Sequence, residues 1–246
     1  MFNIVITGAS RGLGQSLAVA WSQTGHHLHL CGRDPDGLYL TQQQCQKKGA
    51  STQIHRFDLT QQNSLMSTLE AIDQTSPIDL LILNAGISQH TLGYHDDYQI
   101  FKTNLSANIL AIQTILPNML QRDSGKILVI SSLVALIPTL PSANAYHISK
   151  QAIMRYTYSL AQLYRDSSVA IQCICPGFIS TQMTQSHRFP MPGILSCDVA
   201  AQKIKQASSR TCPVISFPRL LYGLVYLLSF LPAAWLARID LQMRRR

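Results

Sequence analysis

The 246-residue sequence has few charges and few of the patterns that mark specialised protein classes. Charged residues make up only 13% of the chain and hydrophobic residues 46%, so the composition suits a globular protein with a buried core. Neither a low-complexity tract nor an internal repeat is present, and no linker rich in proline, glycine or serine interrupts the chain. We therefore expect one main domain.

The chain also lacks a secretory signal and a disulfide framework. Its N-terminus has neither a basic segment nor a cleavage site, and its six cysteines show no framework spacing. We therefore expect reduced thiols and a cytoplasmic protein. Cys173 and Cys175 share one predicted strand face, as do His27 and His29, but neither pair has a further ligand beside it. The sequence accordingly predicts no metal site.

Acidic residues are scarce at the C-terminal end. From Lys203 onward, eight basic residues accompany a single acid, Asp240, so that +7 of the net charge of +8 lies in this stretch. No nucleic-acid recognition motif accompanies the charge, and we expect no nucleic-acid partner. An anionic membrane surface suits the basic end better.

An uncharged segment of 18 residues, Leu220–Ala237, precedes the last basic residues. It is only just long enough to span a membrane, and Pro232 should kink or end a helix within it. Packing within the protein or in a homodimer is our first interpretation, and peripheral membrane association through this tail is the second. A wall of the substrate pocket and a full membrane span are further alternatives.

Short apolar runs alternate with longer helix-like stretches. Runs that are apolar throughout are typical of parallel strands covered on both faces. The alternation predicts an α/β fold, a Rossmann-type doubly wound parallel sheet. Strands are expected at Asn3–Thr7, His27–Cys31, Thr52–Arg56, Leu80–Asn84, Lys126–Ser131 and Ala170–Cys175. Helices are expected at about Gly12–Thr24, Asp36–Lys48, Asn63–Gln74, Asp96–Gln121 and Ala145–Arg165.

The predicted catalytic domain covers residues 1–212, and the apolar and basic tail covers residues 213–246. The domain includes an irregular substrate lid at about residues 178–196. Flexible and aromatic side chains there, such as Met183, Phe189 and Met191, suit an apolar and possibly lipid-like substrate. Packing of this loop onto the core is the alternative interpretation.

A glycine-rich turn follows the first predicted strand and opens the first predicted helix. Glycines let such a turn tighten and let its backbone approach a pyrophosphate at the helix N-terminus. The candidate cofactor-binding residues of the turn are Gly8, Ser10, Arg11, Gly12, Leu13 and Gly14. After the fourth predicted strand, Asn84, Ala85 and Gly86 leave room for a bound dinucleotide, although a plain turn would have the same composition.

The second predicted strand does not end in the acid that usually binds the ribose 2′-hydroxyl of NAD(H). Gly32 stands there, Arg33 follows, and Arg11 lies in the glycine-rich turn. Two guanidinium groups suit a 2′-phosphate, so we expect NADP(H) in preference to NAD(H). The charge of Asp34 keeps NAD(H) as an alternative. Asp58, after the third strand, is expected to accept a hydrogen bond from adenine or to cap the next helix.

Tyr146 and Lys150 are spaced to lie on one face of a helix. An ammonium group beside a phenol favours the phenolate, so this pair suits proton transfer near neutral pH. Together with the turn, Asn104, Ser132 and the stretch from Pro176 to Thr181, the pair stands in an order that resembles the short-chain dehydrogenase/reductase family. The resemblance extends from about residue 3 to residue 208.

The family resemblance implies hydride exchange between a nicotinamide cofactor and an alcohol or carbonyl compound. It implies that Tyr146 is the general acid or base and that Lys150 lowers the pKa of Tyr146 and holds the nicotinamide ribose. Ser132 would bind the substrate oxygen. Asn104 would shape a helix and support a proton-relay water.

The resemblance also implies a role for the segment after the last predicted strand. Its cofactor-binding candidates are Pro176, Gly177, Ile179 and Thr181, of which Thr181 and the backbone near Ile179 would hold the carboxamide. The chain lacks the Asp-Gly-Gly ending common in tetrameric 3-oxoacyl carrier-protein reductases, so we expect a homodimer. A non-catalytic module that binds NADP(H) to regulate or scaffold a partner is the alternative function.

Overall fold

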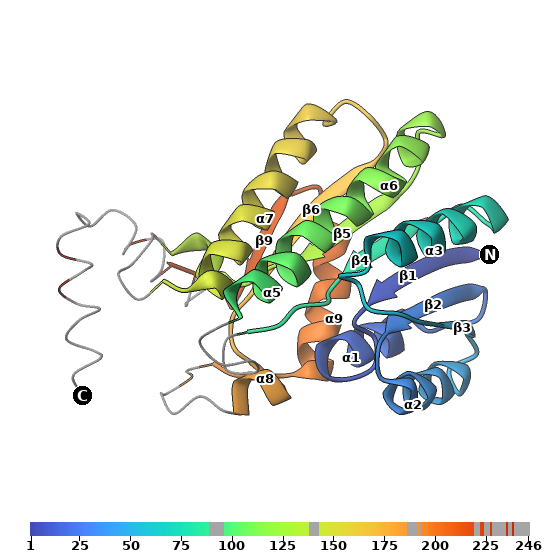
Figure 1. Cartoon of the computed structure of the whole chain (residues 1–246), viewed down its shortest axis with the longest axis horizontal. Coiled ribbons are helices and arrows are strands. Elements are labelled where there is room, and N and C mark those ends of the chain that lie inside the picture. Colours follow the sequence, from blue (N-terminus) through green and yellow to red (C-terminus); the bar gives the residue numbers. More distant parts are fainter. Residues whose placement is uncertain are drawn as a thin grey trace.

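The computed structural model describes residues 1–88, 96–137, 143–185, 191 and 193–218, and the separate residues 222–223, 227, 235 and 238. In the described part, the strands form a seven-stranded parallel sheet of order β3-β2-β1-β4-β5-β6-β9 (Figure 1). These strands are β1 (Phe2–Thr7), β2 (His26–Gly32), β3 (Ser51–Arg56), β4 (Leu80–Leu83), β5 (Lys126–Ile130), β6 (Ala170–Pro176) and β9 (Val214–Phe217). The predicted Rossmann-type fold is confirmed.

Helices cover both faces of the sheet (Figure 1). One face packs on α1 (Gly12–Trp21), α2 (Pro35–Gln46) and α9 (Cys197–Ser208). The other packs on α3 (Gln62–Thr75), α6 (Ala107–Gln121) and α7 (Ala145–Leu163). Because alternate side chains of one strand enter opposite layers, Ile4 and Ile6 of β1 join the first core and Val5 joins the second. The strands are therefore apolar on both faces, as predicted from the sequence.

The single helix predicted at Asp96–Gln121 is divided into three parts. Helix α5 (Asp97–Phe101) leads into a π-helical turn, Lys102–Ser106, and α6 begins after that turn. Within the turn, the backbone N–H of Ala107 donates to the carbonyl of Lys102, five residues back. One extra residue in a helical turn hardly changes the apolar periodicity of the segment. The sequence analysis therefore did not predict the π-helical turn.

Strand β9 and helix α9 were not predicted. Residues Val214–Phe217 lie in the segment assigned to the tail, but they pair with β6 and complete the edge of the sheet. The strand is only four residues long and directly follows Pro213, so its own pattern is weak. Pairing with an existing sheet edge supplies the hydrogen bonds that define it.

The small elements after β6 begin the predicted lid. Strands β7 (Ile179–Ser180) and β8 (Leu195–Ser196) pair in parallel, and the one-turn helix α8 (Gln182–Gln185) follows β7. A 3-10 turn, Leu133–Leu136, follows β5. The middle of the lid and nearly all of the C-terminal tail lie outside the described residues. Among the described residues, no helix is both long and apolar enough to cross a membrane.

Candidate active site

The glycine-rich turn between β1 and α1 requires glycine for two separate reasons. Gly8 and Gly12 have φ angles of +68° and +56°, which other residues adopt rarely. Gly14 lies against the turn itself, because a Cβ atom there would be 1.9 Å from the carbonyl oxygen of Gly8. The backbone of this turn is therefore free of side chains at the points where a dinucleotide would approach it.

Asn84, directly after β4, holds the turn in position. Its Nδ2 donates to the carbonyls of Thr7 and Gly8, at 3.1 and 3.3 Å. The hydroxyl of Thr7 accepts the backbone N–H groups of Asn84 and Ala85, at 3.0 and 3.2 Å. These bonds engage the side-chain amide nitrogen of Asn84 with the protein, so its observed role is to support the cofactor turn.

The ends of β2 and β3 carry the charged groups of the predicted adenosine site. Nη1 of Arg33 lies 3.3 Å from Oδ2 of Asp58, and the Arg33 side chain is 66% exposed. Thr60 donates its backbone N–H and its hydroxyl to Oδ1 of Asp58, both at 2.9 Å. Burial raises the pKa of Asp58, but the hydrogen bonds from Thr60 and the charge of Arg33 outweigh burial, so the pKa lies below its usual value. Asp58 is therefore an anion at neutral pH.

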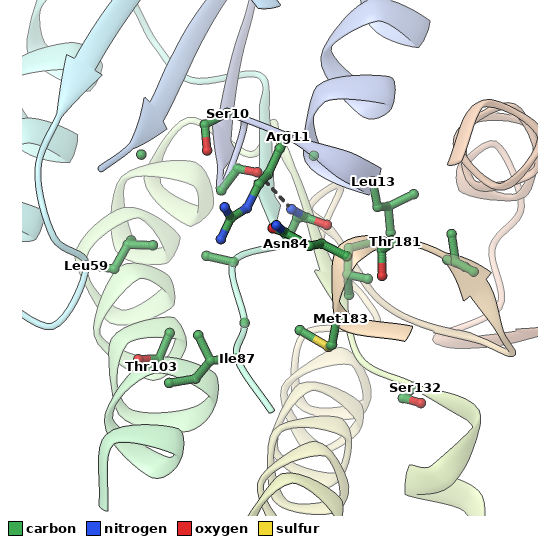
Figure 2. A pocket seen from close by; sticks show the side chains of 18 of the residues that line it. Ser10, Arg11, Leu13, Leu59, Asn84, Ile87, Thr103, Ser132, Thr181 and Met183 are labelled. Atoms are coloured by element: carbon green, nitrogen blue, oxygen red, sulfur yellow. Dashed lines mark hydrogen bonds between the residues drawn. The ribbon is translucent and has the colours of Figure 1, made fainter. Parts of the chain in front are cut away.

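Asp34 acts as the N-cap of α2. Its side chain accepts a hydrogen bond from the backbone N–H of Gly37, at 3.3 Å. The charge of Asp34 kept NAD(H) as an alternative in the sequence analysis. The bond to Gly37 gives this residue another role, because a short acidic or amide side chain suits the N-cap position of a helix. The guanidinium of Arg11 projects from the glycine-rich turn into the same cavity (Figure 2).

Tyr146 lies in the first turn of α7, which Asn144 caps by accepting the N–H of His147 at 3.0 Å. Ser132 comes two residues after β5, and its hydroxyl is close enough to the Tyr146 phenol to lower its pKa. One turn along α7, Nζ of Lys150 lies 5.8 Å from the centre of the Tyr146 ring. The same ammonium donates to the carbonyl of Ile130 at 2.9 Å. The fold thus brings together the three residues on which the predicted chemistry depends.

Burial has the largest effect on the pKa values of Tyr146 and Lys150. It raises the pKa of Tyr146; the hydrogen bond from Ser132 lowers it, and the nearby Cys175 raises it further. Burial also lowers the pKa of Lys150 to about 8, against the opposing influence of Cys173 and Cys175. Burial removes the phenolate from water, so the pKa of Tyr146 is raised in this structure, whereas the family resemblance led us to expect that Lys150 lowers it.

Asn104 lies in the π-helical turn and is completely buried. Its Oδ1 accepts the N–H of Ile87 and its Nδ2 donates to the carbonyl of Ile87, both at 2.9 Å. Its Nδ2 also donates to the hydroxyl of Ser149 at 3.1 Å, and Ser149 donates to the carbonyl of Tyr146 at 2.8 Å. Asn104 therefore connects the chain after β4 with the first turn of α7.

A cavity of about 850 Å³ extends from the glycine-rich turn to Tyr146. Of the predicted site residues, all of which the structure describes, only Gly12 and Asn104 do not line it. The predicted residues that line it are Gly8, Ser10, Arg11, Leu13, Gly14, Arg33, Asp58, Asn84, Ala85, Gly86, Ser132, Tyr146, Lys150, Pro176, Gly177, Ile179 and Thr181. Lining residues that the sequence analysis did not name as site residues include Leu59, Ile87 and Thr103, which are labelled in Figure 2. Thr184 is a further one. They carry no motif, because only their position around the cavity distinguishes them.

Thr184 shapes the first turn of the lid. Its hydroxyl accepts the N–H of Thr181 at 2.9 Å and donates to the carbonyl of Ile179 at 2.7 Å. These bonds hold Ile179 and Thr181 at the cavity wall, which is where the family resemblance expects the nicotinamide carboxamide.

Three histidines form a separate cluster on β2 and β3. Nδ1 of His29 and Nε2 of His55 are 2.9 Å apart, and His27 packs edge-on against His29. Although His55 adds a third ring that the sequence analysis did not anticipate, no group of residues in the described part of the chain has the arrangement of a metal site.

The comparisons with known proteins identify the family. The family model for short chain dehydrogenase matches residues 3–190. The chain belongs to the short-chain dehydrogenase family. A ketoacyl reductase of Nostoc, HetN, is 31% identical over 224 residues, which cover 86% of this chain and 77% of that protein. An uncharacterized oxidoreductase of Myxococcus xanthus is 28% identical over 219 residues, which cover 87% of this chain and 86% of that protein.

The fold of this short-chain dehydrogenase agrees with a solved structure. A short-chain dehydrogenase from Sphingobium yanoikuyae in complex with NADPH matches it with a TM-score of 0.79 and 21% identity, over 95% of this chain and 98% of that one. Family membership makes this chain an oxidoreductase of the class that exchanges hydride between NAD(P)(H) and an alcohol or carbonyl group.

Proposed function

We propose that this short-chain dehydrogenase reduces the carbonyl group of an apolar substrate with NADPH, or oxidises the corresponding alcohol with NADP⁺. The observation that carries the proposal is the contact between Ser132 and Tyr146. Both side chains line the end of a cavity whose other end is the glycine-rich turn, and the Ser132 hydroxyl is close enough to the phenol to lower its pKa. A carbonyl oxygen that accepts bonds from both hydroxyls would lie where its developing charge is stabilised.

The residues have distinct tasks in this mechanism. A bound nicotinamide supplies the hydride. Tyr146 donates its phenolic proton to the carbonyl oxygen, and Ser132 holds that oxygen by a hydrogen bond. The charged form of Lys150 beside the ring favours the phenolate that remains, and its ammonium would hold the ribose of a bound nicotinamide. Asn104 keeps Ile87 and the first turn of α7 in register around the reacting atoms.

The preference for NADP(H) rests on two arginines. Arg33 is mostly exposed, and within the described part of the chain Asp58 is its single ion-pair partner, so its guanidinium can reorient toward a 2′-phosphate at little cost. Arg11 projects into the cavity from the glycine-rich turn. The NADPH complex of the Sphingobium relative is in accord with this preference.

The preference for an apolar substrate rests on the cavity end opposite the adenosine site. Ile87 and Met183 line it there together with Ser132 (Figure 2). An apolar group bound against them would leave the carbonyl as the polar atom that Tyr146 and Ser132 recognise. The ketoacyl reductase of Nostoc, a relative by sequence, is also named for a carbonyl reduction.

The decisive experiment compares Tyr146→Phe with wild type. We expect NADPH oxidation with a panel of apolar ketones and aldehydes to fall by roughly 100-fold or more, because the proton donor is lost. Tyr158→Phe is the matched control, since Tyr158 lies on the same helix and is exposed. Equal rates in wild type and Tyr146→Phe would reject the mechanism. Tight NADPH binding by a wild-type protein with no turnover would instead favour a regulatory binding module.

A further inference from the structure

The π-helical turn before α6 creates a hydrogen-bonding problem. Ala107 donates to Lys102, five residues back, whereas an α-helix would pair it with the residue four back. As a result, one backbone carbonyl in the turn does not receive the N–H group that would pair with it in an α-helix. Asn104, at the middle of the turn, is completely buried, and an unpaired carbonyl is costly there. Another donor is therefore needed at this position.

The side chain of Asn108 supplies that donor. Its Nδ2 lies 2.8 Å from the carbonyl oxygen of Asn104 and 3.3 Å from that of Thr103. Asn108 is 6% exposed, so water does not compete for these bonds. The amide spans the two carbonyls in the middle of the π-helical turn and stabilises the bulged form of the helix against the regular α form.

The bulge determines where the Asn104 side chain points. Removing one residue from the turn would rotate the preceding segment by about 100° around the helix axis. Asn104 would then leave Ile87, to which it makes two bonds at 2.9 Å, and Ser149. The space between Asn104 and Lys150 is already narrow, because a Cβ atom on Gly86 would be 3.3 Å from Oδ1 of Asn104 and 3.4 Å from Nζ of Lys150.

We propose that Asn108 is a positioning residue for the reaction. Its side chain holds the π-helical turn, and the turn in turn holds Asn104, which keeps Ile87 and the first turn of α7 aligned around Tyr146. The inference rests on the proposed function for its effect on turnover. Its effect on the alignment of Ile87 is independent of turnover. Asn108 does not line the cavity, and it acts through the backbone carbonyls of Asn104 and Thr103.

The test combines kinetics with hydrogen exchange. Asn108→Leu keeps the approximate size of the side chain and removes the donor. We expect kcat to fall roughly 10- to 100-fold, as for a small displacement of reacting groups, with the Kd of NADPH within about 3-fold of wild type. We also expect faster amide hydrogen exchange at Ile87, whose N–H would lose the acceptor on Asn104.

Asn118→Leu is the matched control. Asn118 lies on the same helix, and its amide donates to Asp73 at 2.8 Å, away from the cavity. Its replacement should lower the melting temperature without changing kcat or exchange at Ile87. If Asn108→Leu behaved in the same way, Asn108 would be structural only and the proposal would be overturned. Faster exchange at Ile87 with an unchanged kcat would also overturn it.

Asn108→Asp provides a second variant of nearly the same shape, for use if the leucine variant does not fold. The ionised carboxylate cannot donate, but the protonated acid can, and burial favours the protonated form. We expect kcat relative to wild type to recover as the pH falls, and a ratio independent of pH would contradict the proposal. Should wild type show no turnover at all, the proposed function fails. Hydrogen exchange at Ile87 in the Asn108 variants then tests the positioning role. The role is rejected if exchange is the same as in wild type and supported if exchange is faster.

Discussion

Arg33 and Asp58 form an ion pair of 3.3 Å at the edge of the cavity, between the ends of β2 and β3. Thr60 also holds the carboxylate of Asp58, whereas two thirds of the Arg33 side chain is exposed. The arginine is therefore the mobile partner of the pair, and a bound phosphate can replace the carboxylate as its contact.

Replacing Arg33 with serine should change the choice of cofactor. We expect the Kd of NADPH to rise roughly 10-fold or more, the value of a lost charge-assisted hydrogen bond, while that of NADH changes much less. Fluorescence titration with both cofactors measures the difference. Arg165→Ser, at a highly exposed arginine paired with its neighbour Asp166, is the control. Equal weakening of NADPH and NADH binding would show that Arg33 does not read the 2′-phosphate.

Replacing Lys150 with methionine should make the protein more stable and inactive. Burial lowers the pKa of Lys150 to about 8 from 10.5, so the folded state binds fewer protons than the unfolded state between these values. The charged amine therefore costs stability below pH 8, and this cost disappears as the pH rises toward 10.5. We expect Lys150→Met to gain roughly 1–3 kcal/mol in the free energy of unfolding at pH 7.

Denaturant unfolding at pH 7 and at pH 10 tests this expectation. The advantage of the Lys150→Met variant should be large at the lower pH and small at the higher one. An equal or lower stability at pH 7 would mean that the hydrogen bond to Ile130 outweighs the cost of the buried charge.

The histidine cluster should make the protein sensitive to acid. Burial, followed by the charges of His27 and His55, lowers the pKa of His29 to about 3 from 6.5. Below pH 6.5 the unfolded chain binds a proton that the folded chain excludes until about pH 3, so stability falls as the pH falls through this window. The loss approaches about 1.4 kcal/mol per pH unit for this one residue.

His29→Leu should reduce this dependence on pH. Unfolding midpoints at pH 7 and pH 5 in wild type and variant measure the effect. His26→Leu, beside the cluster on the same strand, is the control and should keep the wild-type slope. The same slope in His29→Leu and wild type would assign the acid sensitivity to other groups.

Asp73 should contribute to stability without affecting catalysis. It is buried at the end of α3 and accepts bonds from Ile78, Asn118 and Arg122, at 2.8, 2.8 and 3.2 Å. Asp73→Ala leaves the partly buried Arg122 unpaired, and we expect a loss of about 3 kcal/mol. Asp166→Ala removes the exposed partner of Arg165 and should cost less than about 0.5 kcal/mol. Thermal unfolding and kcat, measured together, separate the two effects.

Much of the fold is local in origin and was therefore predictable. Several of the six predicted strands are apolar throughout, and the helices α2 and α7 begin at the capping residues Asp34 and Asn144. The glycine-rich turn was predictable for the same reason, since its positive φ angles and close contacts admit no other residue. Each of these features depends on a few neighbouring residues, which the sequence displays directly.

The features that the sequence left open depend on contacts between distant segments. Strand β9 exists because it pairs with the edge of β6, and His55 joins the other histidines because β3 pairs with β2. The raised pKa of Tyr146 follows from burial under several elements, which no spacing between Tyr146 and Lys150 records. The sequence alone thus determined the family, the order of the elements and the residues available for chemistry. The tertiary structure decided the direction of the pKa shifts and the π-helical turn that aligns Asn104, because dehydration and long-range hydrogen bonds arise only when separate parts of the chain pack together.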